Sequence, residues 1–248
     1  MDKVMLITGG SRGIGAATAL GAARQGYAVV LSYRTEAEAA AQVVRSIEAA
    51  GGRALAVQAD VAQEADVLRL FAACDAAFGP LTALINNAGI LSRQSRVEDM
   101  DAARIQHILQ VNVVGSFLCA REAVRRMSTR RGGAGGAIVN VSSAASRLGA
   151  PGEFIDYAAS KGAVDTFTIG LAKEVATEGI RVNAVRPGVI LTDIHDTSGE
   201  IGRVERVAPL VPMQRAGTAE EVAASILWLV SDEASYVTAT FIEASGGR

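Results

Sequence analysis

Short apolar runs alternate with longer helix-forming stretches along the whole chain. The runs have the length of buried strands and lie at 4–7, 28–31, 54–58, 83–85, 137–141, 181–185 and 240–242. Strands that alternate with helices are typical of a parallel sheet covered on both faces. The pattern therefore predicts an α/β fold with a doubly wound, seven-stranded parallel sheet. Ligands of such sheets bind at the carboxyl ends of the strands.

Composition is consistent with one domain and excludes several partner classes. The chain has 248 residues, of which 50% are hydrophobic, and no linker-like segment divides it. We therefore expect a single domain over 1–248. A net charge of −2 without a basic tract predicts no nucleic-acid partner and no binding to an anionic membrane surface. The chain enters its first strand without a signal-peptide core, so we expect a soluble, cytoplasmic protein.

The cysteines do not indicate a metal site. Cys74 and Cys119 lack metal-ligand spacing and lie in apolar helical stretches. We interpret them as buried free thiols and expect no metal.

A glycine-rich turn follows the first apolar run. It reads Thr8-Gly9-Gly10-Ser11-Arg12-Gly13-Ile14-Gly15 and leads into a helical stretch at 16–25. A strand, a glycine turn and a helix in this order present backbone N–H groups and the positive helix end to a pyrophosphate. A dinucleotide site is the functional interpretation, and a plain tight turn is the alternative.

Tyr157 and Lys161 stand one helical turn apart. A helix places the phenol and the ammonium on one face, and a nearby cation favours the phenolate, whose unperturbed pKa is about 10. The pair is therefore a candidate for proton transfer, although the same spacing occurs by chance on many exposed helices.

Further motifs follow in a characteristic order. They are Asn86-Asn87-Ala88-Gly89, Asn112 in a helical stretch, Ser142-Ser143 after the fifth apolar run, and Arg186-Pro187-Gly188. Together with the glycine turn and the Tyr157–Lys161 pair, they resemble the short-chain dehydrogenase/reductase family over essentially the whole chain. The sequence is most similar to bacterial glucose 1-dehydrogenase-like and 3-oxoacyl-[acyl-carrier-protein] reductase-like members. The resemblance implies a Rossmann fold and a homotetramer, with a homodimer as the alternative.

The resemblance also implies catalytic roles for Asn112, Ser143, Tyr157 and Lys161. Tyr157 would exchange a proton with the substrate oxygen, and Ser143 would hydrogen-bond the same oxygen. Lys161 would bind the nicotinamide ribose and lower the pKa of Tyr157, while Asn112 would hold a water that leads from Lys161 to solvent. Successive strand residues face opposite ways, so only one of Ser142 and Ser143 can point at the substrate, and the motif favours Ser143.

Charge near the adenosine ribose indicates the cofactor. Tyr33 follows the second apolar run, at the place where relatives selective for NAD carry an acid, and Arg34 stands just beyond it. Arg12 and Arg34 would clamp a 2′-phosphate, so NADP(H) is favoured, with NAD(H) as the alternative. Alternatively, Arg34 is a solvated loop residue. The cofactor residues implied by the resemblance are Gly9, Ser11, Arg12, Gly13, Ile14, Gly15, Tyr33, Arg34, Asp60, Val61, Asn87, Ala88, Gly89, Tyr157, Lys161, Pro187, Gly188, Ile190 and Thr192; Asn86 is expected at the same groove.

The segment 193–212 is polar and contains glycines, so we expect it to form a substrate lid that includes His195. Residues 153–155 are expected to form another wall of the pocket. Asp60 has two interpretations, a contact to adenine and the N-cap of the following helix.

The C-terminal stretch departs from the family pattern. Ala239 stands where many relatives have glycine, and Ser245 stands where they have aspartate. If position 239 needs a positive φ angle, Ala239 is strained or the turn is rearranged.

Two functions fit these features. The first is an NADP(H)-dependent carbonyl reductase or alcohol dehydrogenase that acts on a small sugar-like, acyl or other ketone substrate. The alternative is a catalytically silent NADP(H)-binding regulatory or scaffold protein of the same fold, which would need no proton donor beside the nicotinamide.

Overall fold

A seven-stranded parallel sheet forms the centre of the protein. The computed structural model describes residues 3–192 and 202–248. The strands are β1 (Lys3–Ile7), β2 (Tyr27–Tyr33), β3 (Arg53–Gln58), β4 (Ala83–Asn86), β5 (Gly136–Val141), β6 (Ile180–Pro187) and β7 (Phe241–Ala244). Their order across the sheet is β3-β2-β1-β4-β5-β6-β7, and every neighbouring pair is parallel. The predicted doubly wound fold is confirmed, with the strand order reversing between β1 and β4.

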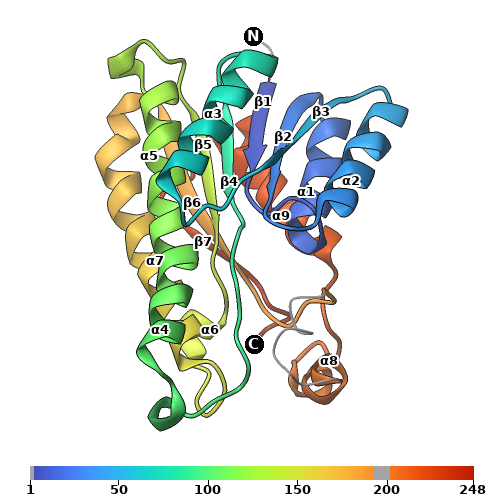
Figure 1. The fold of residues 1–248 in the computed structure, drawn as a ribbon, viewed down its shortest axis with the longest axis vertical. Helices are drawn as coiled ribbons and strands as arrows, with labels where there is room; N and C mark the ends of the chain where they lie inside the picture. The colour runs from blue at the N-terminus through green and yellow to red at the C-terminus, as the bar shows by residue number, and fades with distance from the viewer. Residues whose placement is uncertain (1–2, 193–201) are drawn as a thin grey trace.

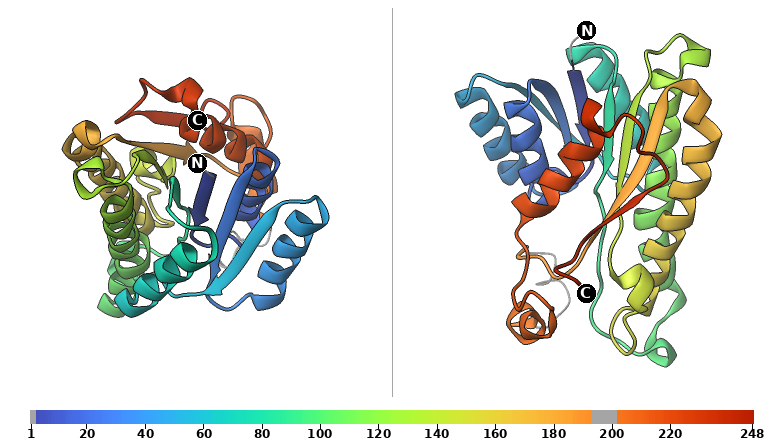
Figure 2. Two further views of the ribbon diagram at one scale, coloured as in Figure 1. Left: turned by 90° about the horizontal axis from the view of Figure 1, so that it is seen from above. Right: turned by 180° about the vertical axis from the view of Figure 1, so that it is seen from behind.

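Helices cover both faces of the sheet (Figures 1 and 2). One face carries α1 (Gly13–Arg24), α2 (Ala37–Ala49) and α9 (Ala219–Val230). The other carries α3 (Glu64–Phe78), α5 (Gly115–Met127) and α7 (Ile155–Val175). Three shorter helices, α4 (Ala102–Leu109), α6 (Ala145–Leu148) and α8 (Arg203–Val207), lie at the end of the molecule where the strands finish.

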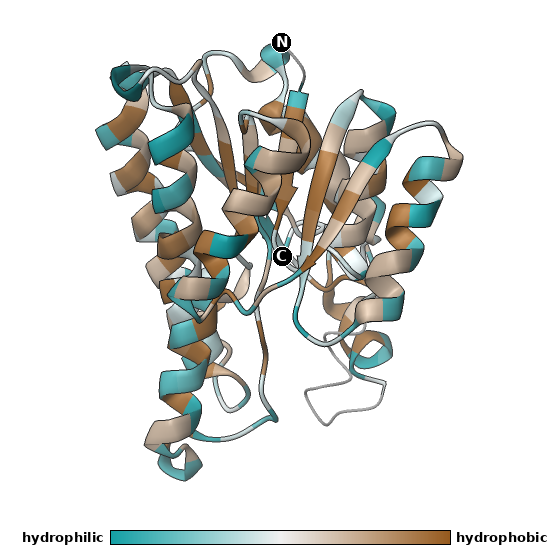
Figure 3. Ribbon diagram, turned by 45° about the horizontal axis from the view of Figure 1, so that its top comes forward, coloured by the Kyte–Doolittle hydropathy of each residue, from teal (hydrophilic) through white to brown (hydrophobic). Residues whose placement is uncertain are grey.

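Alternation along each strand divides the core between the two faces. In β1, Val4 and Leu6 join the cluster under α3, α5 and α7, whereas Met5 and Ile7 join the cluster under α1, α2 and α9. These side chains are fully buried, which explains why the strands read as continuous apolar runs. Figure 3 shows the apolar sheet inside and polar residues on the outer faces of the helices.

The C-terminal strand is preceded by a strained residue. Ala239 has a φ of 58°, in the left-handed region that favours glycine. Its N–H donates to the Val182 carbonyl at 2.8 Å, which ties the turn to β6. The expectation of strain at this position is confirmed, and the turn is kept.

The described residues contain neither a membrane-spanning helix nor a cluster of metal-ligating side chains. No helix in 3–192 or 202–248 has both the length and the apolar character needed to cross a membrane. Within the same two ranges, no group of three or more His, Cys, Asp or Glu side chains suits a metal ion.

Candidate functional site

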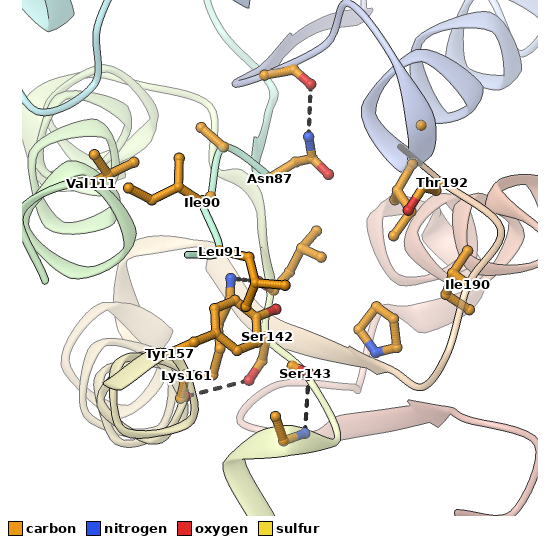
Figure 4. Close-up of a pocket in the computed structure, with 18 of the residues that line it drawn as sticks. Asn87, Ile90, Leu91, Val111, Ser142, Ser143, Tyr157, Lys161, Ile190 and Thr192 are labelled. Carbon is orange, nitrogen blue, oxygen red and sulfur yellow. Dashed lines mark hydrogen bonds between the residues drawn. The ribbon is translucent and has the colours of Figure 1, made fainter. Parts of the chain in front are cut away.

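A cavity of about 360 Å³ opens at the carboxyl end of the sheet. It runs from the glycine turn after β1, past the ends of β2 and β3, to the wall formed by β5 and α7. Figure 4 shows Asn87 and Thr192 toward one end, and Ser142, Ser143, Tyr157 and Lys161 toward the other. The cavity therefore brings together segments that are far apart in the sequence.

The glycine turn forms a cradle at the first helix. Gly9 and Gly13 have φ angles of 64° and 54°, and α1 begins without a side-chain cap or an acidic residue in its first turn. Its free N–H groups and positive dipole end therefore suit an anion. A Cβ at position 15 would lie 2.4 Å from the Gly9 carbonyl oxygen, so this closely packed turn requires glycine there. These features fit a dinucleotide pyrophosphate.

Asn87 holds the glycine turn against the end of β4. Its side-chain amide donates to the carbonyl oxygens of Thr8 and Gly9, at 2.9 Å each. The Thr8 hydroxyl in turn accepts from the N–H groups of Asn87 and Ala88, at 3.0 and 2.9 Å. The two motifs thus form one rigid unit across the reversal in strand order.

Two arginines lie at the cavity, Arg12 in the glycine turn and Arg34 directly after β2. Both are exposed, and within the described residues neither forms an ion pair. Tyr33 ends β2, at the position where the sequence lacks an acid.

Asp60 does not cap the following helix. Its carboxylate accepts from the Ala62 N–H at 2.9 Å, and α3 begins at Glu64 after Gln63, whose side chain makes no capping bond. The N-cap interpretation is therefore wrong, because the Asp60 side chain is used in a tight turn before the helix. Asp60 lines the cavity.

Tyr157, Ser143 and Lys161 meet on one wall. The Ser143 hydroxyl lies beside Tyr157 and accepts from the Ala145 N–H at 3.1 Å. The Lys161 ammonium donates to the Val141 carbonyl at 2.7 Å and lies 5.6 Å from the centre of the Tyr157 ring. An oxygen atom between Ser143 and Tyr157 would therefore face two hydroxyl groups.

Burial sets the protonation of this wall. Burial raises the pKa of Tyr157 above its ordinary value of 10.0, and the neighbouring Ser143 hydroxyl opposes that shift. It also lowers the pKa of Lys161 to about 8, against the attraction of Asp165. The expectation that Lys161 lowers the pKa of Tyr157 is wrong in this structure: desolvation of the phenolate raises it, and the opposing effect comes from Ser143 and not from Lys161.

The adjacent serines have different surroundings. Ser142 donates to the Asp165 carboxylate at 2.6 Å and is 2% exposed, whereas Ser143 faces Tyr157. The geometry agrees with Ser143 as the residue that points toward a substrate.

Asn112 does not line the cavity. It lies in a π-helical turn, η2 (Gln110–Val114), and its side chain is 1% exposed. The amide accepts from the Ile90 N–H at 2.8 Å and donates to the Ser160 hydroxyl at 3.0 Å. Asn112 therefore joins the chain after β4 to helix α7, next to Lys161.

Arg203, in the segment predicted as a lid, contacts the part of the cavity wall formed by Glu153 and Phe154. It pairs with Glu153 at 2.7 Å, and its guanidinium lies 4.8 Å from the centre of the Phe154 ring. Arg206 adds a second contact to Glu153 at 3.1 Å. Within the lid, residues 202–212 form α8 and the short helix η6 (Ala208–Leu210), while His195 falls outside the described residues.

Most of the predicted cofactor residues line the cavity, but a few of the predicted positions do not. Gly15 and Asn86 are buried and do not line the cavity, and the Asn86 amide donates to the Asn140 side chain and to the Ser116 carbonyl. Of the expected wall at 153–155, only Glu153 and Phe154 line the cavity. The predicted residues found at the cavity are Gly9, Ser11, Arg12, Gly13, Ile14, Tyr33, Arg34, Asp60, Val61, Asn87, Ala88, Gly89, Ser143, Tyr157, Lys161, Pro187, Gly188, Ile190 and Thr192.

Sequence reasoning missed several apolar and basic lining residues. Leu91 and Leu148 make part of the lining apolar, and Arg248 adds charge. The apolar residues follow recognised motifs by a few positions, which is the only sequence signal for them. Arg248 has none, because the tertiary fold brings it to the cavity.

Comparisons with known proteins agree with this geometry. A family model described as enoyl-(acyl carrier protein) reductase matches residues 9–248. The chain is 58% identical over 245 residues to the "uncharacterized oxidoreductase YgfF" of Escherichia coli K12, covering 99% of both chains. It is 39% identical over 246 residues to a 3-oxoacyl-[acyl-carrier-protein] reductase of Synechocystis, covering 99% of this chain and 96% of the relative.

Solved structures show the same likeness. A short-chain dehydrogenase of Burkholderia cenocepacia in complex with NADP is 35% identical, with a TM-score of 0.91, and the match covers 100% of this chain and 98% of that one. A short-chain dehydrogenase/reductase of Serratia marcescens is 32% identical at the same TM-score, covering 99% of this chain and 97% of that one.

Proposed function

Because the chain belongs to the short-chain dehydrogenase/reductase family, we propose that this oxidoreductase uses NADP(H) to interconvert a carbonyl and a secondary alcohol on a small substrate. One observation carries the proposal. Ser143, Tyr157 and Lys161 meet on one wall of a cavity whose other end is the uncapped N-terminus of α1. Residues 1–248 would act as one catalytic domain.

The residues at the cavity fit a nicotinamide dinucleotide. Gly9 and Gly13 form the cradle for its diphosphate, together with the N–H groups at the start of α1. Arg12 and Arg34 would hold a 2′-phosphate by charge-assisted hydrogen bonds. When bound, the cofactor supplies or accepts the hydride.

Tyr157 acts as the acid in reduction. Its raised pKa keeps the phenol protonated at neutral pH. The phenol can therefore donate its proton to the carbonyl oxygen as the carbonyl carbon is reduced. Ser143 donates a hydrogen bond to the same oxygen as negative charge develops there. Lys161 is charged below pH 8 and would hold the ribose hydroxyls. Asn112 positions the backbone at Ile90 and the Ser160 hydroxyl beside this group.

The substrate side favours a ketone with an apolar body. Leu91, Leu148 and Phe154 line it, and the Glu153 carboxylate is engaged by Arg203 and Arg206 rather than free to bind a sugar hydroxyl. An acyl or alicyclic ketone therefore fits better than a sugar. The described part of the lid, residues 202–212, would form the outer wall.

A carbonyl panel with NADPH tests the function. We expect turnover that Tyr157→Phe lowers by about 10²–10⁴-fold, because general acid catalysis is lost, while NADPH binding measured by fluorescence is kept. Wild-type protein that binds NADPH but reduces nothing on a broad panel would favour the catalytically silent binding protein instead.

Charge reversal at the rim tests the cofactor. Arg34→Glu should raise the ratio of the KM for NADP to the KM for NAD by about tenfold or more, since it replaces a charge-assisted contact by repulsion. Arg24→Glu, on the same helix as the glycine cradle but outside the cavity lining, is the charge-matched control. An unchanged ratio in Arg34→Glu would leave Arg34 as a solvated loop residue.

The proposal includes a homotetramer. Leu109, Val114, Phe117 and Ile169 are apolar and between 37% and 48% exposed, and Phe117 stacks on Phe167 to join α5 to α7. A second copy of the chain would cover these side chains. Light scattering coupled to size exclusion tests this, with a homodimer as the alternative and a monomer as the result that contradicts self-association.

A further inference from the structure

A buried carboxylate lies behind the wall that carries Tyr157 and Lys161. Asp165, one turn beyond Lys161 on α7, is 8% exposed. One of its oxygens accepts from the Ser142 hydroxyl at 2.6 Å, and the other accepts from Nε and Nη2 of Arg186, at 3.0 and 2.9 Å. The Ser142 hydroxyl also lies 3.4 Å from the Lys161 carbonyl oxygen. The carboxylate thus joins α7 to the residue after β5 and to β6.

Arg186 links Asp165 to a second carboxylate, that of Glu243. Its Nη1 pairs with Glu243 on β7 at 2.8 Å, and its guanidinium lies 3.9 Å from the centre of the Phe241 ring. Arg147 pairs with the same glutamate at 3.2 Å. Burial opposes the charge of Arg186, but the hydrogen bonds to Glu243 and Asp165 outweigh it and raise its pKa. The clamp on Asp165 therefore stays cationic.

The groups around the Lys161 ammonium come from four elements, α7, β5, β6 and β7. Tyr157 and Asp165 lie on its own helix, and the Val141 carbonyl at the end of β5 accepts a hydrogen bond from the ammonium. Arg186 on β6 contacts Asp165, and Glu243 on β7 contacts Arg186. Of these, Asp165 is the charged group that opposes the loss of the Lys161 proton caused by burial. This effect depends on Asp165 staying ionised and in place.

On the premise of the proposed function, we propose that Asp165 is a positioning residue for Lys161, clamped by Ser142 and Arg186 so that it holds α7 to the sheet and stabilises the ammonium form. Asp165 touches neither substrate nor cofactor in this scheme. The Asp165 carboxylate acts through Lys161, by attracting the ammonium. Arg186 weakens this attraction, because its positive charge pairs with the same carboxylate. Removing either partner of the ion pair should therefore change the proton affinity of Lys161 in opposite directions.

The lysine content of the chain makes this measurable. Lysine occurs only at positions 3, 161 and 173, and both Lys3 and Lys173 are exposed. Protein with ¹³C-labelled lysine side chains gives a separate Cε signal for each, so Lys161 can be titrated by NMR without any turnover. Its midpoint in the wild type is expected near pH 8.

Two variants with opposite expected shifts test the proposal. Asp165→Asn keeps the size of the side chain but removes its negative charge, while Arg186 keeps its pair with Glu243, and it should lower the Lys161 midpoint by about one pH unit. Arg186→Gln frees the Asp165 charge and should raise the midpoint by about half a unit or more. Glu38→Gln, which breaks an exposed arginine pair on α2, is the matched control and should leave it unchanged.

The proposal would be overturned if the Lys161 midpoint moved in the same direction in both variants. It would also be overturned if the midpoint stayed unchanged in one or both of them. If Asp165→Asn does not fold, Arg186→Gln decides alone, because a purely structural role predicts no upward shift. In active protein, the alkaline limb of kcat/KM for NADPH should move with the Lys161 midpoint. Correct NMR shifts without any turnover would support the role of Asp165 and contradict the proposed function.

Discussion

Gly15→Ala is a sharp test of how closely the glycine turn is packed. A Cβ at position 15 would lie 2.4 Å from the Gly9 carbonyl oxygen, 2.6 Å from the Asn87 amide nitrogen and 3.0 Å from the Gly10 Cα. Two of these neighbours are main-chain atoms of the turn. The third is the side chain that donates to Thr8 and Gly9, so relief of the clash breaks the link between the turn and β4.

The expected loss follows from these contacts. Overpacking costs about 1–3 kcal/mol, and each of the two amide hydrogen bonds contributes roughly 0.5–1.5 kcal/mol, so we expect about 2–6 kcal/mol of destabilisation. For a chain of this size, that lowers Tm by about 4–24 °C. NADPH affinity should fall as well, because the cradle for the diphosphate is displaced.

The same substitution on α7 supplies a control of opposite sign. A Cβ at Gly162 meets nothing within 4 Å, so Gly162→Ala should stabilise the helix by about 0.5–1 kcal/mol. Thermal unfolding followed by circular dichroism, together with NADPH titration, measures both variants. A Gly15→Ala protein with wild-type Tm and NADPH affinity would refute the reasoning, since the turn would then have room that the structure does not show.

Two further substitutions address the C-terminal turn and the lid. Ala239→Gly should stabilise the protein by about 0.5 kcal/mol in urea unfolding, because relief of roughly 1–2 kcal/mol of left-handed strain exceeds the entropy cost of glycine; a loss of stability would contradict this. Glu153→Gln removes the partner of Arg203 and Arg206 and should raise the KM for the carbonyl more than it lowers kcat. The hydrogen bond from Arg203 lowers the pKa of Glu153 below 4.5, so the pair is complete above that pH and is lost as pH falls through the lowered value. An unchanged KM at neutral pH would argue against this contact as part of the substrate wall.

The strands could be predicted because parallel strands are buried on both faces. The apolar run at 28–31 marks the centre of β2, but the strand extends over Tyr27–Tyr33. Ser32 is polar yet buried, because its hydroxyl accepts from the Gly9 N–H at 3.2 Å. Strand ends of this kind depend on contacts with a distant turn, which hydropathy does not encode.

The candidate site was predictable where it rests on local motifs. The spacing of Tyr157 and Lys161 places both on one face of α7, and the turn between β1 and α1 has the expected shape. The direction of the Tyr157 pKa was not predictable, because it depends on how much protein surrounds the phenol. A charge nearby is visible in the sequence, whereas desolvation is a property of the whole fold.

Features that join distant segments also escaped the sequence. The ion pair between Asp165 and Arg186 spans two elements, and neither residue belongs to a motif that names the other. The π-helical turn that turns Asn112 away from the cavity and toward Ile90 and Ser160 has no marker in its apolar surroundings. Arg203 reaches Phe154 only because α8 folds back over the cavity mouth.

The two cysteines give the protein a practical property. Cys74 and Cys119 are fully buried, and burial raises the pKa of each thiol to about 12. Maleimides and other reagents that need a thiolate should therefore not react with Cys74 or Cys119 at neutral pH. A cysteine introduced at Leu210, which is 68% exposed on η6, would be the sole labelling position for a fluorophore, and the segment beside the cavity could be followed optically in an otherwise unaltered chain.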